Sequence, residues 1–267
     1  GVKKFHADWA LWKAAGERSE MIWDSPWGPG FPGWHIECSA MSMKLLNQHV
    51  DVHVGGIDLR FPHHENERAQ SNAVIGREAV DLWVHGEHLL FEGKKMSKSS
   101  GNVVLVSDII ARGMDPLALR LCFLENRYRS QMDLTWNSIN AAHETLKRWR
   151  SKVSSWGESS SLAIDTEIES AFNNDLDTPK AILRLREIEK ANVENKRELF
   201  MYADQVLGLD LNRPVVAREL TEEMQILLNE RTKARSEKRW ADSDALRVQL
   251  ENLGLEIKDT PEGQNWS

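Results

Sequence analysis

Three side chains of the types that bind zinc occur in two short segments of the sequence. Cys38 ends the segment Gly33-Trp-His-Ile-Glu-Cys, and His63 and Glu67 lie in Phe61-Pro-His-His-Glu-Asn-Glu. The spacing of four places His63 and Glu67 on one helix face, one turn apart, with His64 pointing away from them. Thiolate, imidazole and carboxylate are donors that zinc accepts. The three residues are candidate metal ligands, although alone they would more often be a buried thiol and a surface pair.

A second polar segment is rich in lysine and serine. It reads Gly-Lys-Lys-Met-Ser-Lys-Ser-Ser-Gly-Asn from Gly93 to Asn102, and it places Lys95 and Lys98 three residues apart. Two cations flanked by glycines and hydroxyl groups can bind phosphate oxygens. On its own, such a run is usually a solvated turn.

Taken together, these segments resemble the cysteinyl-tRNA synthetases, a family of class I aminoacyl-tRNA synthetases. Residues Lys95 to Ser99 match the Lys-Met-Ser-Lys-Ser signature of that class, and the resemblance extends from about Asp24 to Trp266. It implies an α/β plus α fold. We expect the second half of a Rossmann-type catalytic domain in residues 1–103, a helical bundle in 104–212 and a small anticodon-binding domain in 213–267.

The resemblance also implies roles for individual residues. Zinc would be held by Cys38, His63 and Glu67 and would recognise the substrate thiolate. ATP, with Mg²⁺, would contact Gly56, Asp58 and Lys98, while Lys95 and Lys98 would neutralise the leaving pyrophosphate. The residues expected around the substrate cysteine are Trp34, His35, His53, His64 and His85. Val54 replaces a glycine of the family pattern and adds a branched side chain beside the nucleotide.

The C-terminal residues provide the expected contacts with tRNA. Charged helix faces such as that of residues 220–238 are usually only solvated. The resemblance implies instead that Arg235, Trp240, Asp244 and Asp259 contact anticodon bases. Aromatic stacking and edge hydrogen bonds from arginine and carboxylates are suited to single-stranded bases. We therefore expect cysteine tRNA as a partner, with cysteine and ATP.

Two family features do not occur in the 267 residues: a His-Ile-Gly-His-type nucleotide signature and an earlier zinc cysteine. In the family both precede the region matched here, so the chain resembles an N-terminally truncated synthetase. We expect a missing N-terminal half, from the same polypeptide before truncation or supplied in trans, and a fourth zinc ligand from outside the chain or from solvent. Half of a Rossmann sheet should also expose an apolar face.

Composition narrows the class of protein. Acidic residues outnumber basic ones by 41 to 34, giving a net charge of −7, so RNA contacts must be local rather than general. The two cysteines, Cys38 and Cys122, are too few for a disulfide framework and suit a reducing compartment. No apolar run approaches the length of a membrane span. We expect a cytoplasmic protein with no membrane partner.

Two other functions remain open. A cysteine ligase of mycothiol synthesis shares the zinc and lysine motifs, and residues 103–107 are somewhat similar to it, but that enzyme lacks an anticodon domain. A synthetase relic that binds RNA without chemistry is the non-enzymatic alternative. Locally, the spacing predicts an amphipathic helix over 2–16, a helix over 35–48, and strands over 50–54 and 79–85.

Overall fold

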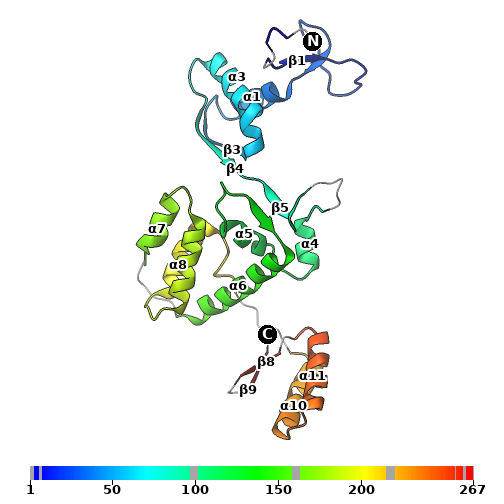
Figure 1. The fold of residues 1–267 in the computed structure, drawn as a ribbon, viewed down its shortest axis with the longest axis vertical. Helices are drawn as coiled ribbons and strands as arrows, with labels where there is room; N and C mark the ends of the chain where they lie inside the picture. Colours follow the sequence, from blue (N-terminus) through cyan, green and yellow to red (C-terminus); the bar gives the residue numbers. More distant parts are fainter. Residues whose placement is uncertain are drawn as a thin grey trace. The chain divides into compact units, whose positions relative to one another are not determined.

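The computed structural model describes residues 3–5, 8–96, 102–157, 163–214, 220–255, 257–260 and 263–266. The chain divides into two compact units, Gly1–Leu211 and Asn212–Ser267. Each unit has its own hydrophobic core. The helices and strands of both are drawn in Figure 1.

A short antiparallel hairpin opens the first unit. Strands β1 (Trp12–Ala14) and β2 (Gly30–Pro32) pair with Trp12 opposite Pro32. The predicted helix over 2–16 is wrong for the part that is described, because these residues form β1 and irregular chain. Aromatic residues at helical spacing instead contact side chains elsewhere: Trp9 meets His35 and Trp12 meets Trp27.

A parallel strand pair with two helices follows. The elements are α1 (Trp34–Leu45), β3 (Val50–Gly56), the single turn α2 (Ile57–Leu59), the π-helical turn η1 (Arg60–His64), α3 (Glu65–Ile75) and β4 (Val80–Gly86). The two predicted strands and the helix after residue 34 are confirmed. Strands β3 and β4 pair in parallel, and α1 packs against α3. This α/β arrangement places the ends of both strands beside η1.

The β3–β4 pair has two different faces. Cross-strand register sets His53 beside Trp83 and Gly55 beside His85, whereas Val52 lies beside Leu82 on the opposite face. Val52, Val54 and Leu82 are each more than half exposed. The expectation of an exposed apolar sheet face is therefore confirmed, and the histidines occupy the other face.

The rest of the first unit is mainly helical. A three-stranded sheet is ordered β6-β5-β7, and the elements are β5 (Leu89–Phe91), β6 (Lys94–Lys95), α4 (Val106–Ala111), α5 (Leu117–Leu124), β7 (Met132–Leu134), α6 (Trp136–Ser155), α7 (Thr166–Asn173), α8 (Thr178–Lys190) and α9 (Lys196–Leu207). Asp115 accepts a hydrogen bond from the backbone N–H of Leu117, as a capping residue does. Trp149 and Phe200 are fully buried and meet edge to face, joining α6 to α9.

The second unit is small and contains both helix and strand. It comprises α10 (Glu222–Ser236), α11 (Trp240–Asn252) and the antiparallel hairpin of β8 (Ile257–Thr260) and β9 (Gly263–Trp266). Figure 1 shows α10 and α11 lying side by side. Leu228, Leu250 and Ile257 are buried in its core. The hairpin was not predicted from the sequence.

Among the residues that the structure describes, no helix is both long enough and apolar enough to cross a membrane.

Candidate functional site

Helix α1 is held so that Cys38 faces α3. The helix begins after Gly33, whose backbone packs against residue 10 so closely that an added Cβ would lie 2.0 Å from the carbonyl oxygen of Ala10. Only glycine fits there. One turn into the helix, the buried Ser39 hydroxyl lies 3.1 Å from Gln70 Oε1 on α3. This contact fixes α1 against the helix that bears Glu67.

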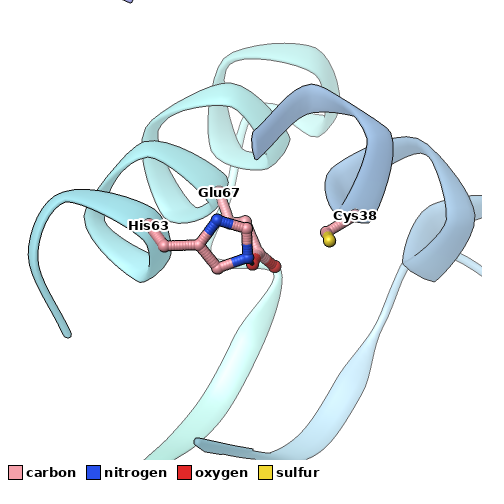
Figure 2. A group of neighbouring side chains, drawn as sticks. All are labelled: Cys38, His63 and Glu67. Atoms are coloured by element: carbon pink, nitrogen blue, oxygen red, sulfur yellow. Dashed lines mark ion pairs between the residues drawn. The ribbon is translucent and has the colours of Figure 1, made fainter. Parts of the chain in front are cut away.

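The three predicted metal ligands converge. Donor atoms of Cys38, His63 and Glu67 all lie within 4.8 Å of one another, and His63 and Glu67 are buried. Figure 2 shows Cys38 on one helix facing the other two side chains across a short gap. His63 Nε2 and Glu67 Oε1 are 2.5 Å apart without the geometry of a hydrogen bond, and Oε1 has no hydrogen-bond donor among the described residues.

The side chains that converge at this site favour the binding of a cation. Burial raises the pKa of Glu67 to about 7. The pKa of Cys38 is raised too, first by burial and then by the negative charges of Glu67 and Glu37. Sulfur, imidazole nitrogen and carboxylate oxygen all present electron pairs to the same space. A divalent ion would reverse both pKa shifts and satisfy these atoms, so the residues present fit zinc.

Neighbouring histidines are arranged in two pairs. His35 Nδ1 lies 2.7 Å from His63 Nδ1, and His64 Nδ1 lies 2.8 Å from His85 Nε2. Each pair needs one ring to donate and the other to accept, as neutral imidazoles can. Burial, helped by neighbouring histidines, lowers the pKa of His64 to about 4. Burial likewise lowers the pKa of His35 and His63. With its Nδ1 engaged, His63 turns Nε2 toward Glu67.

Two tryptophans frame the histidines. Trp34 stacks on His63 with ring centres 4.2 Å apart, and it is more than half exposed. Trp83 stacks on His53 at 4.6 Å, as the strand register requires. Gly55 makes room for this cluster, because a Cβ there would lie 2.5 Å from His64 Cε1. Trp83 was not identified from the sequence, because its place opposite His53 depends on the register between the two parallel strands.

A second set of donors shares Glu67. His53, His64 and Glu67 also have ligand atoms within 4.8 Å of one another. His63 therefore belongs to the first set of donors and His64 to the second, and Glu67 belongs to both. The set that contains Cys38 offers the softer donors, which favours it as the zinc site.

Two of the residues expected at ATP, Gly56 and Asp58, lie near the carboxyl ends of the parallel strands, where open α/β sheets bind ligands. Gly56 ends β3, and Asp58 is exposed in α2. Val54 points to the exposed apolar face rather than to the histidines. Lys95 is exposed on β6. Lys98 lies outside the described residues.

The four residues expected at the anticodon are brought together in the second unit. The Arg235 guanidinium lies 5.8 Å from the ring centre of Trp240, which is 56% exposed. Asp244 is exposed one helical turn after Trp240. Asp259 on β8 forms an ion pair with Arg235, with 3.0 Å between Oδ2 and Nη1.

Comparison with known proteins identifies the family. Residues 1–144 match the family described as tRNA synthetases class I (C) catalytic domain, and residues 217–266 match the cysteinyl-tRNA ligase anticodon binding domain. The chain is 42% identical over 273 residues to "Cysteine--tRNA ligase 1" of Burkholderia lata, covering 99% of this chain and 58% of that protein. It is 40% identical over 289 residues to "Cysteine--tRNA ligase" of Thermus thermophilus, covering 97% and 60%.

These matches place the chain in class I of the tRNA synthetases. Within that class it belongs to the family of the class I (C) catalytic domain, to whose curated cysteine--tRNA ligases it is similar over nearly its whole length. The chain spans about three-fifths of the length of these relatives. The match at residues 217–266 disfavours a mycothiol-type ligase, which has no anticodon domain.

Proposed function

We propose that this chain acts in the cytoplasm in the ATP-dependent ligation of cysteine to its tRNA. In the first step the cysteine carboxylate attacks the α-phosphorus of ATP, forming cysteinyl-adenylate and releasing pyrophosphate. In the second, a hydroxyl at the 3′ end of the tRNA takes the cysteinyl group and AMP leaves. The observation that carries the proposal is the convergence of Cys38, His63 and Glu67 in a member of this family.

Zinc is the proposed cofactor, held by these three residues. When bound, it supplies a soft Lewis acid for the thiolate of cysteine, which the hydroxyl of serine cannot match. His63 is suited to this role because its pKa is lowered and its Nδ1 is engaged by His35, leaving Nε2 as the donor. Trp34, stacked on His63, supplies an exposed aromatic wall beside the ligands.

The surrounding histidines complete the proposed cysteine pocket. His35, His53, His64 and His85 lie in one network of ring contacts with His63. The pKa of His53 is lowered mainly by burial, as it is for His35 and His64, so these rings are neutral near pH 7. Neutral rings at His35, His53 and His64 do not repel a cation, and they can hydrogen-bond the substrate in either direction.

For the nucleotide, Gly56 and Asp58 are proposed to contact ATP and its ribose hydroxyls, with Mg²⁺ on the phosphates. Lys95 and Lys98 are proposed to neutralise the charge that develops on the leaving pyrophosphate. Such positioned cations stabilise a phosphoryl or nucleotidyl transition state by several kcal/mol. The exposure of Lys95 and Asp58 is compatible with these contacts.

The second unit is proposed to bind the anticodon of cysteine tRNA. The chain carries a net charge of −7, so affinity must come from particular contacts. Arg235, Trp240, Asp244 and Asp259 form one partly exposed group with a stacking surface, a guanidinium and carboxylates. These are the groups that read single-stranded bases.

Cobalt substitution tests the cysteine site. Protein purified without added metal should contain one zinc per chain. With Co²⁺ in place of zinc, the Cys38 thiolate should give a near-ultraviolet charge-transfer band, and added cysteine should increase it while serine should not. A chain without zinc, or one that responds equally to serine and cysteine, would refute the proposal. Cys122→Ala, which alters a buried helical residue, should behave as the wild type.

A further inference from the structure

A small cavity lies between α1, α3 and the β3–β4 pair. Its volume is about 10 Å³, and residues of all four elements line it. A cavity of this size is just large enough for one water molecule, which stays there only if polar groups face it. What the cavity holds therefore depends on the polar atoms of its walls.

Three side chains that line this cavity each have a buried polar atom without a partner. The atoms are Nε1 of Trp83, Nδ1 of His49 and Oε1 of Glu67, and none has a hydrogen-bond partner among the described residues. In the described part of the first unit, no other buried side-chain nitrogen or oxygen is in this state. Buried polar atoms are nearly always hydrogen-bonded, often to buried water. Their concentration at one cavity indicates a shared polar ligand.

These three atoms have complementary hydrogen-bonding roles. The indole N–H of Trp83 can only donate. His49 Nε2 lies 3.1 Å from Oδ2 of Asp81, and because a carboxylate only accepts, Nε2 carries the hydrogen. In a neutral imidazole the other nitrogen, Nδ1, is then an acceptor, as the Glu67 carboxylate is. One donor and two acceptors are what a water molecule needs, since it can accept one hydrogen bond and donate two.

We propose that the cavity binds one water molecule, which accepts a hydrogen bond from the Trp83 indole and donates to His49 Nδ1 and to the Glu67 carboxylate. Trp83 and His49 are then positioning residues that act on Glu67 through this water. Their effect on the metal rests on the proposed zinc site. A carboxylate has about four acceptor sites, so the water leaves room for a metal on Glu67. Outer hydrogen bonds to a ligand strengthen metal binding by about tenfold or more.

The water is tested in metal-free protein, by NMR of the nitrogen-15-labelled 267-residue chain. The sequence contains eleven tryptophans, and the indole signal that is missing from Trp83→Phe identifies Trp83. Its N–H should show a cross-peak to water in a rotating-frame Overhauser experiment, although the nitrogen is buried. Ser71→Ala removes a hydroxyl from the same cavity and should keep this cross-peak. A cross-peak that is absent from the wild type, or that disappears with the serine hydroxyl, would overturn the inference.

The effect on the metal is measured by competition for zinc with a chromophoric chelator. Trp83→Phe removes the N–H donor but keeps an aromatic ring to stack on His53, and it should lower the zinc affinity about tenfold. Trp23→Phe is the matched control: Trp23 is exposed and does not line the cavity, so this variant should bind zinc as the wild type does. A folded Trp83→Phe protein with full zinc affinity would overturn the positioning role.

Two substitutions of His49 separate the water from the contact with Asp81. The side-chain oxygen of asparagine takes the place of Nδ1, whereas the amide of the longer glutamine takes the place of Nε2. His49→Asn therefore keeps an acceptor for the water and loses Asp81, and it should retain most of the zinc affinity. His49→Gln keeps the contact with Asp81 and loses the acceptor, and it should lower the affinity about tenfold. Equal affinities, or the reverse order, would overturn the inference.

Failure of the zinc site and failure of the water site give different results. A wild type that binds no zinc would refute the proposed zinc site, and with it the effect of Trp83 and His49 on the metal. The cross-peak between water and the Trp83 indole is measured without metal, so it tests the water by itself. If Trp83→Phe does not fold, the two His49 variants still measure the effect on zinc affinity.

Discussion

Two buried glutamates of the first unit have opposite surroundings. Glu67, at the candidate metal centre, is 3% exposed, and its Oε1 has no hydrogen-bond donor among the described residues. Glu189, in the helical region, is 7% exposed and accepts from Arg148, from the Trp149 indole and from Lys152. Burial raises the pKa of Glu67 to about 7. Burial would also raise the pKa of Glu189, but its donors lower it below the ordinary value.

The different partners of these two glutamates distinguish a proposed metal ligand from a residue that stabilises the fold. A buried carboxylate is costly unless it is paired. Glu189 is paired by its own chain and therefore links α6 to α8. Within the described part of the chain, the groups that converge on Glu67 are potential metal donors, so a bound cation would stabilise the arrangement. Burial alone does not distinguish the two residues. The lack of a hydrogen-bond donor to Oε1 among the described residues is what supports Glu67 as a proposed ligand.

Removing a ligand should have the largest effect. Cys38→Ser should lower the zinc affinity of the chain by at least about a hundredfold, because the hard hydroxyl replaces the soft thiolate. Competition with a chromophoric chelator would measure this affinity. Cys122→Ala is the matched control and should retain zinc. Equal zinc affinity in Cys38→Ser and the wild type would show that the metal lies elsewhere.

Local spacing predicted part of this site, namely that His63 and Glu67 share a helix face, whereas the joining of Cys38 to them was implied by the resemblance to the family. The His63–Glu67 interval and the strands at β3 and β4 depend on periodicity alone. The pairing of Trp83 with His53 depends on the register between strands 30 residues apart, which spacing within one strand does not give.

The ends of the chain were predicted less well. The aromatic spacing of residues 5–12 suggested a helix, but Trp12 pairs in a hairpin with residue 32, so a tertiary contact overrides local periodicity. In the second unit the buried Arg231 donates a hydrogen bond to Asp259 of the β8–β9 hairpin, 28 residues away. Charge spacing in the sequence made Arg231 look like one more solvated residue.

Removing the paired glutamate should have the next largest effect. Glu189→Leu leaves the buried Trp149 indole N–H without an acceptor, and such a group costs about 1–3 kcal/mol. The free energy of unfolding, measured with urea at pH 7, should fall by about 2–3 kcal/mol. Zinc affinity should not change. A variant as stable as the wild type would mean that the carboxylate contributes nothing to the helical core.

In metal-free protein, Glu67→Gln should increase the free energy of unfolding, and this increase should be smaller than the decrease caused by Glu189→Leu. Glu67 has an ordinary pKa of 4.5 and a folded pKa of about 7, so the folded state binds the proton more tightly. The contribution of the Glu67 carboxyl to the stability of the folded protein is therefore lost as pH rises from 4.5 through about 7. With a chelator present, the free energy of unfolding of the variant relative to that of the wild type should increase by about 2 kcal/mol as the pH rises from 5 to 8.

Urea unfolding of both proteins at the two pH values measures this gain. Added zinc should abolish the advantage of the variant, because the ion pairs with the wild-type carboxylate. A difference that is independent of pH would show that the Glu67 carboxylate is not buried as a proton-binding group.

The smallest effects should come from the partly exposed donors of Glu189. Arg148 and Lys152 are 47% and 40% exposed and bind the same oxygen, Oε1. Arg148→Met or Lys152→Met alone should cost less than about 1 kcal/mol, because the other cation remains and solvent screens both. The double variant should cost more than the sum, since the carboxylate then keeps only the Trp149 N–H and becomes more like Glu67. The pKa of Glu189 should rise accordingly, so the double variant should lose stability most steeply as pH increases. Urea unfolding of the four proteins at pH 5 and pH 8 measures both terms, and strictly additive costs would show that the two glutamates differ in something other than their donors.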